Sequence, residues 1–90
     1  MNNEIKDNEN KKQMGMSLME FQERWYEAEN DELRKEGKMD YNVVVDINGS
    51  EWVADDYFII GNDYKNYWVE LTYKGHKTGS IMLKYIKLVY

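Results

Sequence analysis

The sequence predicts an α+β domain in which one N-terminal amphipathic helix packs on a small five-stranded antiparallel barrel or curled sheet. Two observations lead to this fold class. Apolar residues follow a helical period in the first third of the chain, and the pattern changes to short alternating strands after Gly37. A chain of 90 residues has room for one hydrophobic core, so the helix and the strands are expected to form one domain.

The first segment differs from the rest of the chain. Residues 1–15 are polar and show no hydrophobic period, which is typical of a disordered tail. The single helix-plus-barrel domain is therefore expected to span residues 16–90.

The helix has clear start and stop signals. Ser17 and Glu20 form an S-x-x-E capping box, in which the serine side chain accepts from a backbone N–H of the first turn. Gly37 is the expected C-terminal stop, so the helix is predicted over residues 18–36. Its apolar stripe is expected to consist of Leu18, Phe21, Trp25 and Ala28, with Leu33 at the edge.

A first hairpin follows the helix. The strand predicted over residues 41–47 ends at Asn48 and Gly49, a strong hairpin signal, and residues 51–54 form the returning strand. A two-residue loop would place Asp46 opposite Glu51, an unfavourable pair of like charges, whereas a three-residue loop avoids it. The register of this hairpin stays open.

The second half is predicted to contain the remaining strands. Residues 57–60 form a strand, residues 61–63 a turn, and residues 67–73 a strand with clean alternation. Residues 74–79 are predicted to be a turn, and residues 80–90 carry the last one or two strands. About five short strands with tight turns are typical of a small barrel or curled sheet.

Residues 63–89 carry a pattern of acidic turn, aromatic strand and closing segment. Asp63 precedes the Tyr-Trp-Val-Glu-Leu segment of residues 67–71, and residues 78–89 contain a glycine, an isoleucine, a tyrosine, aliphatic residues and a leucine in that order. This pattern resembles Src-homology-3 (SH3) domains, in which an acidic turn leads into a Trp-Trp strand, a turn, and a closing segment of the type Gly-Tyr-Ile-Pro-Ser-Asn-Tyr-Val. The resemblance covers about a third of the chain and implies an SH3-like barrel. A bacterial barrel that converged on the pattern is the alternative.

The departures from the SH3 pattern concern its ligand groove. Met82 replaces the proline of the closing segment, and Tyr67 replaces the first tryptophan. The Ala-Leu-Tyr-Asp-Tyr motif is missing and the acidic loop is much shorter. Only Tyr67 and Tyr85 correspond to residues of the aromatic groove with which SH3 domains bind polyproline ligands. The resemblance therefore implies a barrel that does not bind polyproline.

Composition excludes several classes of chemistry. The chain has no cysteine, which excludes disulfides and thiolate metal sites and fits a reducing compartment. There is no apolar run of the length of a membrane span or a signal peptide, so a cytoplasmic protein without membrane contact is expected. The bias toward Asn, Lys, Ile and Tyr indicates an AT-rich genome, such as that of a low-GC Gram-positive bacterium or its phages.

Catalytic groups are sparse. His76 is the one histidine and lies in a Lys-Gly-His-Lys segment, where an exposed residue is expected. Ser17 and Ser50 already have capping and turn roles, so a nucleophilic triad around His76 is not predicted. A zinc site is not expected with one histidine and no cysteine, and no cofactor-binding glycine loop is present. The sequence therefore predicts a chain that binds and does not catalyse.

Charge is unevenly distributed along the chain. Residues 17–63 carry a net charge of −9, residues 64–90 carry +4, and the whole chain carries −5. One interpretation is solubility together with attraction between the two halves. The other is a negative face that steers toward a basic cleft of a larger protein, such as a nucleic-acid-handling enzyme. Its acidic residues are Glu23, Glu27, Asp31, Glu36, Asp40, Asp46, Glu51, Asp55 and Asp56.

The functional hypothesis is a small protein-binding module of the kind that phages and mobile elements use. Such a module inhibits a larger host or defence enzyme by covering its active surface. Because tyrosine and tryptophan dominate interface hot spots, four aromatic residues are the candidate anchors. They are Trp25, Tyr26, Trp52 and Tyr67.

Three other functions stay open. The basic last third could bind single-stranded nucleic acid by stacking, although its excess of charge is small. Its residues are Lys65, Lys74, Lys77, Lys84 and Lys87 with Tyr64, Tyr67, Tyr73 and Tyr85. An immunity protein for a co-encoded toxin would use the same contacts as the inhibitor. A homodimer could form through an exposed strand edge or a Trp-rich helix face.

Overall fold

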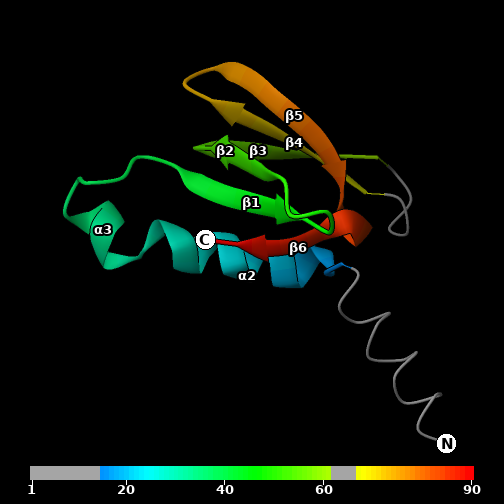
Figure 1. The fold of residues 1–90 in the computed structure, drawn as a ribbon, viewed down its shortest axis with the longest axis horizontal. Coiled ribbons are helices and arrows are strands. Elements are labelled where there is room, and N and C mark those ends of the chain that lie inside the picture. Colours follow the sequence, from blue (N-terminus) through cyan, green and yellow to red (C-terminus); the bar gives the residue numbers. More distant parts are fainter. Residues whose placement is uncertain (1–14, 62–66) are drawn as a thin grey trace, which may run out of the picture.

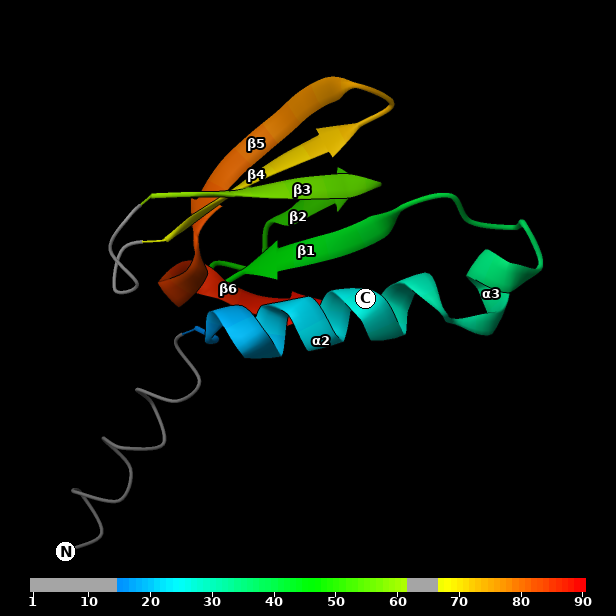
Figure 2. The same ribbon diagram turned by 180° about the vertical axis from the view of Figure 1, so that it is seen from behind.

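The computed structural model describes residues 15–61 and 67–90 (Figures 1 and 2). Almost all of the predicted tail, and most of the predicted turn at residues 61–63, lie outside the described residues. The described chain contains two helices, six strands and one 3-10 turn: α2 (Leu18–Glu29), α3 (Glu32–Lys35), β1 (Asn42–Asp46), β2 (Glu51–Ala54), β3 (Asp56–Ile60), β4 (Trp68–Tyr73), β5 (His76–Met82), η1 (Leu83–Tyr85) and β6 (Ile86–Val89).

The strands form two antiparallel sheets of three strands each. One sheet has the order β2-β1-β6 and the other the order β3-β4-β5. The α+β class is confirmed and the sheets are compatible with a small barrel-like fold, but they do not close into a barrel. The described strands also differ in number from the predicted five. A bend at Asp55 separates β2 from β3, and η1 separates β5 from β6, so each of these segments contributes to both sheets.

The N-terminal helix begins as the sequence predicts. The Ser17 Oγ accepts from the backbone N–H of Glu20 at 3.1 Å, which is the expected cap. Gly37 has a φ of +72° and follows the last helical turn, as expected of a C-terminal stop.

The prediction of one continuous helix over residues 18–36 is wrong. α2 ends at Glu29, and α3 starts after a break at Asn30 and Asp31. The Asn30 side chain donates to the carbonyl of Tyr26 at 2.8 Å, and the Asp31 backbone carbonyl accepts from the N–H groups of Arg34 and Lys35 in α3. Side chains such as that of asparagine compete with the helix by forming local bonds to the backbone, which explains the break at Asn30.

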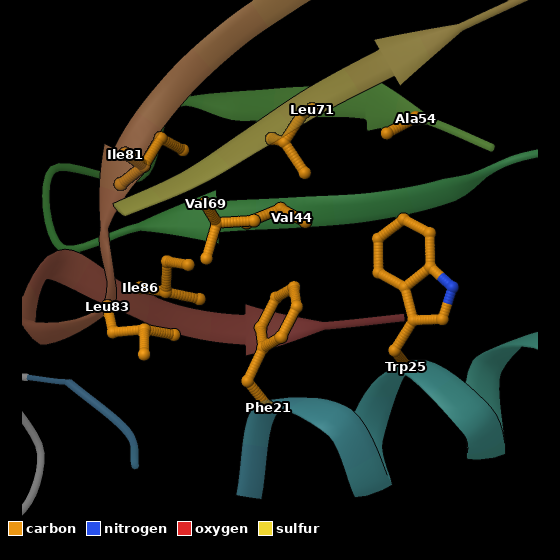
Figure 3. Close-up of a cluster of buried hydrophobic side chains, with 9 residues drawn as sticks. All are labelled: Phe21, Trp25, Val44, Ala54, Val69, Leu71, Ile81, Leu83 and Ile86. Carbon is orange, nitrogen blue, oxygen red and sulfur yellow. The ribbon is translucent and has the colours of Figure 1, made fainter. Parts of the chain in front are cut away.

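The inner face of α2 packs on both sheets. Phe21 and Trp25 are buried, and both rings meet Tyr57 of β3 edge-on, with centroid distances of 4.9 and 4.7 Å. Leu18 and Ala28 are half-buried at the ends of the same stripe, and the Leu33 side chain lies outside the described set. Figure 3 shows Phe21 and Trp25 pointing from the helix toward the buried side chains of the strands. The core thus fixes the orientation of the helix.

The structure settles the register of the first hairpin. Val45 faces Glu51, and the backbone N–H of Asp46 donates to the carbonyl of Ser50 at 3.0 Å. The loop therefore has three residues, 47–49, and Gly49 takes the left-handed position with a φ of +85°. Asp46 and Glu51 are not directly opposite, so the pairing of like charges is avoided.

The prediction of a turn over residues 74–79 is also wrong. The turn contains only Lys74 and Gly75, both with positive φ, and β5 begins at His76. Gly79 lies inside β5, where the Trp52 ring covers it, and a Cβ at this position would clash with that ring. The glycine that predicted a turn instead allows the close approach of the Trp52 ring to the strand.

The alternation predicted for residues 67–73 is confirmed. Val69 and Leu71 are fully buried, whereas Trp68, on the other face of β4, is exposed.

Candidate partner-binding surfaces

The side of α2 that points away from the core carries a shallow hollow with both aromatic and acidic lining. We call this set of residues the outer face of α2; it consists of Met19, Gln22, Glu23, Tyr26 and Glu27. Met19 and Tyr26 are 71% and 67% exposed, which is unusual for large apolar side chains on a helix that packs well on its other side. The spacing of three and four residues places the members on one stripe.

The outer face of α2 combines an anchor with charge. Tyr26 offers a large side chain with few rotatable bonds and a polar hydroxyl, which is typical of an interface hot spot. Glu23 and Glu27 lie beside it and are exposed. Arg24 approaches Glu27 at 3.6 Å, and both side chains of this pair are exposed to solvent, so the pair contributes little to stability. The arrangement suits a contact with a basic surface.

The structure separates the four candidate anchors. Tyr26 is on the surface, whereas Trp25 is 4% exposed and belongs to the core. Trp52 is half-buried against Gly79, and its indole N–H donates to the Asp46 Oδ2 at 3.4 Å. Tyr67 is half-buried and packs against the core. The helical stripe that contains Trp25 was visible in the sequence, and its burial leaves Tyr26 as the exposed anchor of α2.

The acidic residues of the strands hold local structure. Asp46 accepts from the backbone N–H groups of Asn48 and Ser50, at 2.8 and 3.0 Å. Partial burial acts to raise the pKa of Asp46, but these bonds and the indole N–H outweigh it, so the pKa lies below its ordinary value.

The other predicted acids of the strands also have partners within the fold. Asp55 Oδ2 accepts from the backbone N–H of Lys74 at 2.9 Å, and Asp56 Oδ1 accepts from that of Tyr57 at 2.8 Å. Glu51 Oε2 accepts from the Tyr90 hydroxyl at 3.2 Å. Glu23 and Glu27 share a hollow with the exposed Tyr26 ring. Asp31 is exposed at the helix break, and its backbone carbonyl accepts from the N–H groups of Arg34 and Lys35 in α3.

The basic residues are partly neutralised. Lys74 Nζ lies 3.5 Å from Asp40, whose other oxygen accepts from the Tyr73 hydroxyl at 3.0 Å. The Tyr73 bond is the main reason that the pKa of Asp40 is lowered. Lys77 pairs with Glu70 at 3.5 Å. Lys65 and Tyr64 lie outside the described residues. These ion pairs weaken the positive potential that phosphate binding needs.

An apolar surface that the sequence reasoning missed lies on the outside of the β3-β4-β5 sheet. Phe58, Ile60 and Trp68 are 53%, 46% and 42% exposed, and Ile60 faces Trp68 across the two strands. The run Tyr-Phe-Ile-Ile of β3 is apolar on both faces of the strand, and this pattern in the sequence could have predicted an exposed apolar surface. Large exposed apolar clusters are typical of contact sites.

Within residues 15–61 and 67–90, no three His, Asp or Glu side chains gather in a way that could hold a metal ion. His76 is exposed at the start of β5. None of the described helices has the length and apolar character needed to cross a membrane.

Comparison of the chain with protein-family models, with curated proteins and with solved structures finds no match.

Proposed function

We propose that this chain is a non-catalytic protein-binding module that docks through the outer face of α2 on a basic surface of a larger protein. The observation that carries the proposal is the exposure of Tyr26 between Glu23 and Glu27 on a helix whose opposite face is locked into the core. A rigid helix presents its anchor with little loss of conformational entropy on binding.

The biological role that fits this contact is inhibition by occlusion. A small acidic domain that covers a basic cleft of a nucleic-acid-handling enzyme competes with the enzyme's own substrate, and long-range attraction speeds the encounter. A phage or mobile-element inhibitor of a host or defence enzyme acts in this way. An immunity protein for a co-encoded toxin would use the same contact chemistry, and the neighbouring genes distinguish the two.

An SH3-like origin of the scaffold is part of the proposal. It is supported by the closing segment of residues 78–89 and by the two small antiparallel sheets. The shortened loop and the missing proline separate this chain from polyproline readers.

The test is capture from host lysate with matched variants. The tagged protein is incubated with nuclease-treated lysate, and retained proteins are identified by mass spectrometry. We expect one dominant basic protein that is lost at high salt and lost with the double variant Glu23→Lys/Glu27→Lys. The control Glu32→Lys/Glu36→Lys makes the same change in net charge at the start of α3 and at the residue that follows it, and it should retain the protein. Equal capture by both variants would contradict the proposal.

Direct binding of single-stranded nucleic acid is the alternative. Fluorescence anisotropy at low salt decides it, and the absence of binding to oligonucleotides at high micromolar protein removes it.

Self-association is a second candidate because of the exposed cluster formed by Phe58, Ile60 and Trp68. A homodimer through this surface should appear in sedimentation velocity and should be lost on Trp68→Lys. A monomer at all accessible concentrations removes this candidate.

A further inference from the structure

A second hollow lies between the β1–β2 turn, the end of β5 and η1. Its volume is about 270 Å³. The lining is mostly apolar and aromatic, with one carboxylate: Asp46, Ile47, Trp52, Ile81, Met82 and Tyr85 contribute to it. Pockets that hold small molecules or cofactors usually have about 300–1,000 Å³, so this hollow fits a single side chain better.

Two aromatic rings and one fixed negative charge meet in this hollow. Asp46 Oδ1 accepts two backbone N–H groups, while Oδ2 accepts the Trp52 indole N–H at 3.4 Å. A carboxylate has about four acceptor positions, so Oδ2 can accept a further donor. The anion next to the indole N–H also makes the Trp52 ring more electron-rich, which strengthens its attraction for a cation.

Tyr85 contributes a second ring to the hollow. The Lys84 ammonium lies 5.2 Å from the centroid of this ring and does not line the hollow. Tyr85 itself is 39% exposed, so its ring is accessible.

Charge selects the class of occupant. An anion would be repelled by Asp46, and a neutral apolar group would remove water from the carboxylate without compensation. A cation on an aliphatic stem matches both the carboxylate and the apolar lining of the hollow. The stem packs on Ile47 and Met82 while the charged head contacts the rings and Asp46.

We propose that this hollow receives a basic side chain, lysine or arginine, of the protein partner. The identity of the occupant as a partner residue rests on the proposed function, whereas the preference of the hollow for an alkyl cation does not.

The direct test is an NMR titration of the full chain with N-acetyl-lysine methylamide as the probe. The arginine analogue and the neutral norleucine analogue are titrated in parallel. We expect saturable shifts of the Trp52 indole N–H and of the backbone at residues 46–48, and binding of the norleucine analogue at least about threefold weaker than that of the lysine probe. Absence of saturable shifts, or equal binding of norleucine, overturns the proposal.

Variants locate the site. Tyr85→Leu and Asp46→Asn should each weaken the lysine probe by about three- to tenfold. Asparagine keeps an oxygen acceptor for the turn, so the fold is retained while the charge is lost. Tyr90→Leu removes another exposed tyrosine that does not line the hollow, and it should leave probe binding unchanged. An equal loss in the Tyr90 variant contradicts the assignment.

Failure of this proposal is distinguishable from failure of the docking proposal. If the lysine probe does not bind but Glu23→Lys/Glu27→Lys abolishes capture, the hollow is rejected and docking by α2 stands. If the probe binds and the charge reversals leave capture unchanged, the chemistry of the hollow stands and docking by α2 falls.

Discussion

Acidic side chains on α2 and acidic side chains in the strands differ in what they contact. Glu23 and Glu27 surround an exposed tyrosine on the outer face of α2. Asp46 and Asp55 accept backbone N–H groups and hold turns in place. The same residue type therefore serves two purposes, and a net charge of −5 does not by itself describe a binding face.

The difference comes from the local backbone. A turn leaves N–H groups without partners in a ladder, and a nearby aspartate satisfies them. A helix interior has no such groups, so a glutamate on its surface is left to interact with solvent or with a partner. We expect that removal of the turn acids changes stability, whereas removal of the helix acids changes association.

The largest effect should come from the core beneath α2. Phe21→Ala should lower the free energy of unfolding by about 3–5 kcal/mol, because the side chain is fully buried and packs on Trp25 and Tyr57. Tyr26→Ala, on the outer face of the same helix, should change it by less than about 0.5 kcal/mol. Chemical denaturation measures both. A similar loss in the two variants would mean that the outer face of α2 also carries stability.

The next effect concerns the β1–β2 turn. Asp46→Ala should lower the thermal midpoint clearly, because the N–H groups of Asn48 and Ser50 lose their acceptor. Asp46→Asn should recover part of the loss, since one oxygen remains. Glu23→Ala is the matched control on the helix and should leave the midpoint nearly unchanged. If Asp46→Ala leaves the thermal midpoint unchanged, Asp46 does not stabilise the turn and the prediction is wrong.

The pH dependence of stability should show the contribution of the carboxylates that accept hydrogen bonds within the fold. The pKa values of Asp46 and Asp40 are lowered from 3.8 in the folded chain, so the unfolded chain binds more protons once the pH approaches that value. Their contribution to stability is complete above the unfolded pKa and is lost as the pH falls through the folded pKa. We expect stability to decrease below about pH 4 and the decrease to be shallower in Asp46→Asn, measured by urea unfolding between pH 2 and 6. An identical pH profile for the two proteins contradicts this.

Charge reversal of the helix acids should have only a small effect on stability. Glu23→Lys/Glu27→Lys should change the free energy of unfolding by less than about 0.5 kcal/mol, since the exposed pair of Arg24 and Glu27 contributes only a few tenths. The measurement is a denaturation curve recorded beside the capture assay. A large destabilisation would make loss of capture uninformative about docking.

Local signals were predictable from the sequence, because they depend on neighbouring residues. The Ser17 cap, the stop at Gly37 and the alternation of β4 follow from capping, backbone freedom and pleat. The break at Asn30 competes with a helical period that continues through it, and periodicity alone does not show which of the two prevails.

Contacts between distant segments were not predictable from periodicity. Gly79 read as a turn residue because its partner, Trp52, lies in another sheet. Tyr26 and Trp25 are neighbours in the sequence, yet only their position relative to the sheets decides which is core and which is surface. The exposed position of Phe58 and Ile60 depends in the same way on which face of β3 meets α2.

The central position of β1 has a consequence for the order of folding. β1 pairs with β2 through a three-residue loop, but its other edge pairs with β6, which follows about forty residues later. The hairpin and the β3-β4-β5 sheet consist of neighbours along the chain, whereas the β1–β6 pair has to close a long loop first. We therefore expect the slow step of folding to be the arrival of β6 beside β1, after the local hairpins have formed.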